Sequence, residues 1–327
     1  MIFSELVPET PKTTDFWPNP MSAREDTAKL LASLSPLEGY NLTPLPDVRL
    51  LRSDRPLART PVLYDPGIVI VCQGSKQGYF GGEVYRYDAQ HYLAVAAPVP
   101  FTMETQASAA EPLLAIYLHL DFELAADVLL QIHQHGGWPE ASAKSMVSTP
   151  LDAALAATVL RLVQALADPL ETAVLGRGLL RELYYRVLTG DQGGAMRAAL
   201  ARQGKFGQIF KTLRRIHADY REPLTVEALA LDAAMSVPTY HHHFKAVTGT
   251  TPIQYLKSIR LHQARLLMVR SDRSAAVAAS DVGYESASQF GREFKRLFGL
   301  SPAQEVRRMR SSFALPPQVN PAFVSSH

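Results

Sequence analysis

Two stretches of the chain, fifty residues apart, share one pattern of residues. Residues 236–252 read SVPTYHHHFKAVTGTTP, and residues 286–302 read SASQFGREFKRLFGLSP. Each stretch begins with serine, has aromatic residues at its fifth and ninth positions and lysine at its tenth, and closes with glycine and then proline. Such repetition at a fixed offset indicates that one supersecondary unit is built twice.

Each stretch predicts a helix with defined ends. Ser236 and Ser286 are suited to cap the start of a helix, because a serine oxygen accepts a hydrogen bond from a free amide of the first turn. The aromatic residues four positions apart form one buried face. Gly249 and Gly299 stand where a helix commonly ends in a left-handed residue.

A shorter helix is expected before each stretch, which makes each copy a helix-turn-helix unit. In the first copy the short helix runs over 226–233 behind the capping residue Thr225, and in the second copy it covers 277–280 before a turn at Gly283. A longer helix over 252–268 links the two copies.

The part of the chain before these units predicts first a sheet and then helices. Short runs rich in β-branched and aromatic residues, separated by turn formers, favour an antiparallel sandwich or small barrel. These runs are VLY from Val62, IVIVC from Ile68, EVYRY from Glu83, YLAVAA from Tyr92 and LLAIYLHL from Leu113. From Phe122 onward apolar residues recur every three or four positions, which indicates amphipathic helices.

Composition and charge exclude several classes of protein. The single cysteine, Cys72, rules out an internal disulfide, a zinc finger and an iron–sulfur site, and we expect its thiol to be buried and inert. No secretion signal or membrane helix is expected, so a soluble cytoplasmic protein without membrane contact is predicted. Residues 1–200 carry 15 basic and 22 acidic side chains, whereas residues 201–327 carry 18 and 9. The basic last third is therefore a candidate for binding a polyanion.

The last third resembles the DNA-binding domain of the AraC/XylS-type transcriptional regulators, in which one helix joins two helix-turn-helix units. The resemblance runs from about Phe206 to Val306. The residues that carry it are Gly249, Arg260, Ala264, Leu267, Gly283-Tyr284, Ser286, Phe290, Arg292, Phe294-Lys295, Gly299 and Ser301-Pro302. The front half is similar to the cupin-like N-terminal domain of one AraC subgroup, in the runs VLYDPGIVIVCQGSKQGYFGG and EVYRYDAQHYLAVAAPVPF.

The resemblance implies an α+β chain with an N-terminal cupin-like antiparallel β-barrel, a helical connector and a C-terminal all-α double helix-turn-helix. The domains that we expect are an N-terminal extension without an assigned role (1–60), the cupin-like regulatory domain with its helical connector (61–189), a linker (190–204), the DNA-binding domain (205–310) and a disordered tail (311–327).

The residues expected to contact DNA lie on the outer surface of the second helix of each unit, because the aromatic residues of that helix face inward. Arg292 is suited to bind guanine with two hydrogen bonds and Gln289 to bind adenine. Serines at the helix starts and lysines near the helix ends are suited to contact phosphates. The full set is Pro238, Thr239, His241, His242, Ser288, Gln289, Arg292, Ser236, Ser286, Lys245 and Lys295.

Two features of this region have alternative interpretations. Arg260 either faces DNA or has a structural role, for example in an ion pair with Glu227, and the structural role is favoured. The run His241-His242-His243 is not expected to hold a metal, because neighbouring residues on a helix point about 100° apart. We expect neither a metal nor a cofactor in this chain.

A barrel of this kind is either an enzyme or a binding pocket. The His-x-His pair of metal-dependent cupins is missing from the strand region, so we expect no catalysis. The resemblance to the AraC-type regulators implies an unknown small-molecule effector in the barrel. Candidate lining residues alternate along the strands, but the alternation leaves open which face is the interior. They are Tyr79, Tyr85, Tyr87, Tyr92, Phe101 and Met103. The helices over 151–188 either present Leu175, Leu179 and Leu183 to a partner chain or cap the barrel.

The sequence thus predicts a sequence-specific regulator whose two recognition helices read successive major grooves of promoter DNA. RNA polymerase and a second copy of the chain are further expected partners. The alternatives are an effector-independent or nonspecific DNA-binding protein and, less favoured, a cupin enzyme or carrier.

Overall fold

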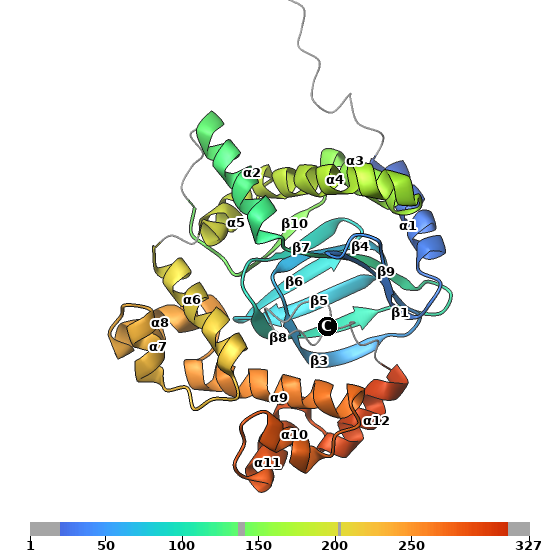
Figure 1. Ribbon diagram of the computed structural model, residues 1–327. Coiled ribbons are helices and arrows are strands. Elements are labelled where there is room, and N and C mark those ends of the chain that lie inside the picture. The colour runs from blue at the N-terminus through green and yellow to red at the C-terminus, as the bar shows by residue number, and fades with distance from the viewer. Residues whose placement is uncertain (1–19, 137–140, 202–203, 313–327) are drawn as a thin grey trace, which may run out of the picture.

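The computed structural model describes residues 20–136, 141–201 and 204–312. Within these ranges the chain forms a single antiparallel sheet followed mainly by helices (Figure 1). The strands are β1 (Gly39–Leu42), β2 (Val48–Ser53), β3 (Leu57–Tyr64), β4 (Gly67–Gln73), β5 (Ser75–Phe80), β6 (Glu83–Asp88), β7 (His91–Val95), β8 (Val99–Gln106), β9 (Leu113–His119) and β10 (Met146–Pro150). Their order in the sheet is β1-β2-β9-β4-β7-β6-β5-β8-β3, and β10 pairs with β7.

The sheet curls, so that it has an inner and an outer apolar face. Val69, Val71 and Phe101 belong to the inner cluster of side chains, whereas Ile68 and Ile70 pack with the helices outside. Residues 68–71 follow one another along β4, so their side chains point alternately to the outer and the inner face, as the pleat requires. The structure therefore settles which face is the interior.

Of the candidate lining residues, Tyr87, Phe101 and Met103 lie in the inner cluster and Tyr85 packs against it. Tyr92 belongs to the outer cluster instead. The half-buried ring of Tyr79 lies under the guanidinium of Arg59.

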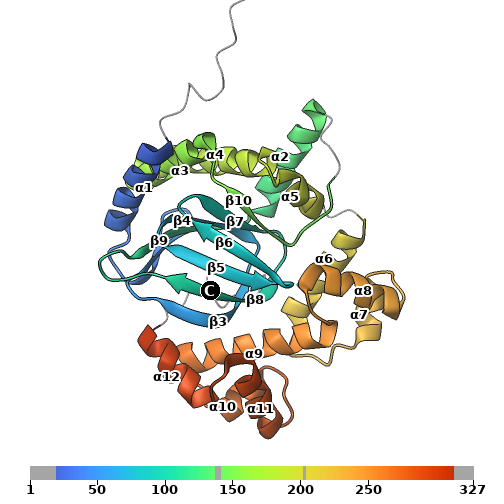
Figure 2. The ribbon, with the colours of Figure 1, turned by 180° about the vertical axis from the view of Figure 1, so that it is seen from behind.

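Helices cover the outer face of the sheet and form the rest of the chain. They are α1 (Pro20–Leu34), α2 (Phe122–His135), α3 (Ala153–Leu166), α4 (Pro169–Thr189), α5 (Gly193–Leu200), α6 (Gly204–Asp219), α7 (Val226–Asp232), α8 (Val237–Thr248), α9 (Pro252–Arg270), α10 (Ala275–Asp281), α11 (Ala287–Phe298) and α12 (Pro302–Ser312). Seen from both sides, α1, α3 and α4 lie over one side of the sheet, and α9 runs along the opposite side next to β3 (Figures 1 and 2).

The connector helices mainly cap the barrel. Leu183 is fully buried and Leu179 is half-buried, whereas Leu175 is exposed. Cys72 is buried in the outer cluster, and burial raises the pKa of its thiol to about 12, so that the thiol stays protonated at neutral pH. No helix among the described residues has the length and apolar character needed to cross a membrane.

The sheet begins earlier than the boundary expected at residue 61. β1 and β2 lie in the first sixty residues, and β2 pairs with β9 along its whole length. The turn formers around Pro46 and Asp47 obscured these strands in the sequence. β5, β8 and β10 were also not predicted as strands.

The expected linker over 190–204 contains helix α5. Gly193 begins this helix, and a Cβ atom at that position would lie 2.3 Å from the carbonyl oxygen of Leu188. Glycine is therefore required there for close approach of the backbone. At the other end of the chain α12 reaches residue 312, so the expected tail over 311–327 falls almost entirely outside the described residues.

Protonation of a buried histidine should make the folded chain sensitive to acid. His217 is buried, its Nε2 lies 2.8 Å from the Tyr255 hydroxyl, and burial lowers its pKa to about 3. In the unfolded chain the pKa of a histidine is about 6.5, so below that pH the unfolded state binds a proton that the folded state does not. The free energy of unfolding should therefore fall as pH drops from about 6.5.

The measurement is urea denaturation at several pH values between 7 and 5. Where the unfolded state binds one proton more than the folded state, His217 changes the free energy of unfolding by about 1.4 kcal/mol per pH unit. His217→Gln should reduce the slope of the free energy of unfolding against pH by that amount. An unchanged slope in His217→Gln would refute this account of the acid sensitivity.

Candidate nucleic-acid interface

The second helix of each repeated unit is capped as its sequence predicts. The Ser236 hydroxyl accepts a hydrogen bond from the Thr239 amide at 3.4 Å, and the Ser286 hydroxyl accepts one from the Gln289 amide at 3.2 Å. The helices α8 and α11 end at Gly249 and Gly299, which both adopt left-handed backbone angles. The structure thus confirms the predicted helix-turn-helix geometry in both copies.

The first helix of each unit is also capped. The Thr225 hydroxyl accepts from the Ala228 amide and begins α7, and the Ser274 hydroxyl accepts from the Val277 amide and begins α10. The second of these helices is longer than predicted, since it covers Ala275–Asp281.

The aromatic residues of α8 and α11 face inward, and the predicted DNA-facing residues face outward. Tyr240, Phe244, Phe290 and Phe294 are at most 1% exposed. Two predicted contact residues, Thr239 and His241, are half-buried, and the others are exposed. The exposed ones are Ser236, Pro238, His242, Lys245, Ser286, Ser288, Gln289, Arg292 and Lys295.

Several cations on these two helices are not neutralised by neighbours. Among the described residues, Lys245, Arg292, Lys295 and Arg296 form no ion pair. The nearby ion pairs involve other cations, such as Lys257 with Glu293 and Arg215 with Asp232. The outward face of α8 and α11 is therefore polar and positively charged, which suits it to a phosphate backbone.

The C-terminal ends of the two helices are held in place. The Ser145 hydroxyl donates to the Val247 carbonyl at 2.5 Å, and the Phe80 ring lies against Gly249. At the end of α11, the Phe298 ring lies under the buried Arg265 guanidinium at 4.4 Å. The contact residues nearest the helix starts thus project into solvent while the other ends are anchored.

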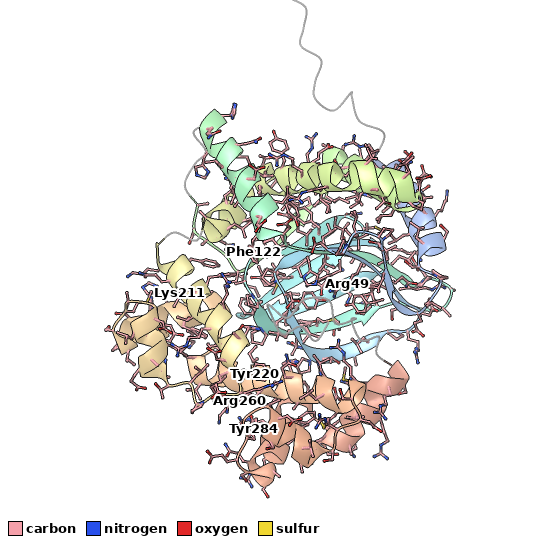
Figure 3. All side chains as sticks on the ribbon, in the orientation of Figure 1. Arg49, Phe122, Lys211, Tyr220, Arg260 and Tyr284 are labelled. Atoms are coloured by element: carbon pink, nitrogen blue, oxygen red, sulfur yellow. The ribbon has the colours of Figure 1, made fainter. Side chains whose placement is uncertain are left out.

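Arg260 has the structural role that was favoured, but with different partners. Its guanidinium donates to the backbone carbonyls of Tyr220, Glu222 and Gly283, at 2.7, 2.9 and 3.0 Å. Figure 3 shows Arg260 between Tyr220 and Tyr284, where α9 meets the second unit. No contact with Glu227 is part of this arrangement. Arg260 therefore ties the loop before the first unit to the turn of the second.

The sequence did not indicate two charged clusters that the structure assembles. Glu293 accepts hydrogen bonds from Lys257, Tyr284 and Gln289. A second cluster joins the fully buried Arg265 to Glu305 at 3.3 Å. The spacing of Gln289 and Glu293, four residues apart on one helix, was the only signal available for the first cluster.

The histidine run lies on one helix, with the rings of His242 and His243 5.2 Å apart, edge to face. Over the ranges that the structure describes, no group of three or more histidine, cysteine, aspartate or glutamate side chains is arranged to hold a metal ion.

The turn of the second unit should tolerate no side chain at Gly283. Its φ is +85°, and a Cβ atom there would lie 2.5 Å from the Arg221 carbonyl oxygen. Gly283→Ala should lower the free energy of unfolding by more than about 2 kcal/mol, since the left-handed backbone alone costs 1–2 kcal/mol. Gly299→Ala is the matched control: its φ is +77° with open space around the site, so only the backbone cost applies. Equal losses in urea denaturation would contradict the role assigned to close approach at Gly283.

These features define a class of protein: an antiparallel half-barrel joined to two helix-turn-helix units that share one connecting helix. Family models place the chain more closely. Residues 44–195 match the AraC-type transcriptional regulator N-terminus, and residues 229–308 match a helix-turn-helix domain.

Known proteins agree with this placement. The chain is 38% identical over 93 residues to the transcriptional activator RhaS of Escherichia fergusonii, which is 28% of this chain and 33% of RhaS. It is 40% identical over 86 residues to the RCS-specific activator RclR of Escherichia coli, which is 26% of this chain and 30% of RclR. The match thus spans about a third of the length of these relatives.

The crystal structure of apo ToxT from Vibrio cholerae has a similar fold. Its TM-score is 0.55 at 11% identity, over 80% of this chain and 97% of that chain. The chain belongs to the AraC/XylS-type transcriptional regulators, in the subgroup with an AraC-type N-terminal domain.

Proposed function

We propose that the chain is a sequence-specific regulator of transcription that binds double-stranded promoter DNA and acts in the cytoplasm. In this proposal residues 205–310 are the DNA-binding domain, and the sheet with its covering helices regulates it. α8 and α11 read successive major grooves on one face of the duplex. The family is a family of regulators and not of enzymes, and we propose no catalytic role.

The observation that carries the proposal is that α8 and α11 both pack against α9. Both helices expose the residues near their starts, where recognition helices contact base edges. α9 has 19 residues and is therefore about 28 Å long at 1.5 Å per residue. One turn of B-DNA is about 34 Å, so two units on one such helix have a scale that fits adjacent turns of the major groove.

Selection of fragmented genomic DNA on the purified full chain tests the proposal. The bound fragments are sequenced at two salt concentrations, because nonspecific binding weakens steeply with salt. We expect a few promoter sites, each with two short motifs about one turn apart, to persist at the higher salt. Uniform recovery that vanishes with salt would instead support the nonspecific alternative.

Two variants on α11 separate base reading from phosphate contact. Arg292→Ala should reduce discrimination at a single base pair by about 1–3 kcal/mol, because an arginine fork reads guanine with two hydrogen bonds. Lys295→Ala should weaken binding to all sequences about equally and lower the salt slope by about one. Affinities for a panel of single-base variants of the selected site measure both effects. An equal loss on every sequence in Arg292→Ala would remove base reading from that residue.

An effector in the barrel is the regulatory part of the proposal. A cavity of about 240 Å³ opens on the inner side of the sheet, and its lining includes Leu51 and Met103 from the barrel and Arg310 from α12. One solved ToxT structure holds an unsaturated fatty acid, which is a property of that protein. For this chain we propose only that a small molecule binds in the cavity and alters how the two regions contact each other.

The genes beside the selected sites suggest which compounds to test. A true effector should raise the Tm of the full chain, by the equivalent of about 2.7 kcal/mol at a hundredfold excess over its Kd. It should also change the affinity for the selected DNA. If none of these compounds does either, the effector-independent alternative is favoured. RNA polymerase and a second copy of the chain stay predictions as partners.

A further inference from the structure

The Glu293 carboxylate, in the middle of α11, is the centre of a cluster of hydrogen bonds. Its Oε1 accepts from Lys257 Nζ at 2.7 Å and from Gln289 Nε2 at 3.2 Å. Its Oε2 accepts from the Tyr284 hydroxyl at 2.8 Å. The side chain of Glu293 is only 11% exposed, although it lies on the same face of α11 as the exposed Gln289.

Two of these three donors come from residues outside α11. Lys257 comes from α9, and the Tyr284 ring packs edge-on against the buried ring of Phe290. Burial raises the pKa of Glu293, but the hydrogen bonds from Lys257, Tyr284 and Gln289 outweigh it and hold the pKa below its usual range. The group is therefore an ionised carboxylate whose position is set independently of Gln289.

A carboxylate only accepts hydrogen bonds, which decides how the Gln289 amide is oriented. The NH₂ group must face Glu293, so the amide oxygen faces away from it. One N–H is used on Glu293, and the other N–H lies beside the free oxygen. The exposed edge of Gln289 thus offers one donor and one acceptor in a fixed order.

That order matches one base and opposes another. Adenine presents the N7 acceptor and the N6 amino donor in the major groove, and the amide complements both. Guanine presents two acceptors, N7 and O6, so the amide oxygen would face O6 without a hydrogen between them. A freely rotating glutamine could turn its NH₂ group toward guanine, whereas the clamped one cannot without breaking its bond to Glu293.

We propose that Glu293 is a positioning residue that fixes the Gln289 amide for adenine and against guanine, which rests on the proposed reading of DNA by α11. The first repeated unit has no such arrangement. Fifty residues earlier stand Gly207, Ala234, Thr239 and His243 in place of Lys257, Tyr284, Gln289 and Glu293. The adenine preference should therefore arise at one base pair of the second half-site only.

The test measures the ratio of affinities for two duplexes that differ by adenine or guanine at one position. That position is the base pair at which Gln289→Ala lowers the preference of the full chain for adenine. Glu293→Leu has a similar size but no oxygen to accept a hydrogen bond, so it no longer holds the NH₂ group of Gln289. We expect the adenine-to-guanine ratio to fall about tenfold, in line with the loss of one bidentate contact.

The overall affinity gives an independent signature. Glu293→Leu removes a negative charge near the DNA, so affinity for unrelated sequences should stay constant or rise slightly. Damage to the fold would instead lower the affinity for every duplex together and leave the ratio unchanged. In the Gln289→Ala background, Glu293→Leu should change the ratio no further, because the residue through which Glu293 acts is gone.

Tyr284→Phe provides a second variant with the carboxylate intact. It removes one of the two hydrogen bonds that Glu293 accepts from residues outside α11, and a smaller fall in the ratio is expected. A ratio that stays at the wild-type value in both Glu293→Leu and Tyr284→Phe overturns the inference, and so does a Gln289→Ala variant with unchanged base preference. In either case a wild-type chain that still prefers its selected site leaves the proposed function standing. A wild-type chain without any sequence preference overturns both.

Discussion

Helix α9 has buried residues on every side, and the arrangement of the C-terminal part depends on that burial. Tyr255, Ile259 and Ala264 are fully buried, and so are the polar His262 and Arg265. A helix that is buried all round needs neighbours all round. α9 packs against α8, α10, α11, α12 and strand β3, so both helix-turn-helix units and the sheet are held by the same helix.

The buried charge on α9 makes this arrangement specific. Arg265 pairs with Glu305 of α12, whose carboxylate also accepts hydrogen bonds from Arg308 at 2.8 and 2.9 Å. Removing one partner of a buried pair leaves an uncompensated charge, which typically costs 3–5 kcal/mol. Both arginines also contact β3, through the Pro61 carbonyl at 3.4 Å and the Thr60 hydroxyl at 3.2 Å. The same cluster therefore closes the DNA-binding region and joins it to the barrel. In the proposed function, an effector acts through such contacts only by its different affinity for the two states.

The C-terminal region could be predicted in detail because its signals are local. Caps at Ser236 and Ser286, left-handed glycines and aromatic residues four apart depend on neighbours within one or two turns. The barrel was predicted in outline only. β2 was missed because its pairing with β9 joins residues far apart in sequence, and alternation along a strand could not tell the interior from the exterior.

In the candidate site, too, local features could be predicted from the sequence, whereas contacts between distant segments could not. The outward position of Arg292 and Gln289 follows from helical period, and the structure agrees with it. The bonds of Arg260 to three carbonyls and the contacts of Glu293 with Lys257 and Tyr284 join separate segments. No spacing in the sequence indicated these contacts, because they depend on how α9 packs against the second unit.

The central claim is that one rigid helix presents two reading helices to successive grooves on one face of the DNA. Hydroxyl-radical footprinting of the full chain on its best selected site tests this claim most directly. The account predicts two protected windows about 10 base pairs apart on the same face, which appear together as protein is added. A single protected window, or two windows that fill at different protein concentrations, would contradict it.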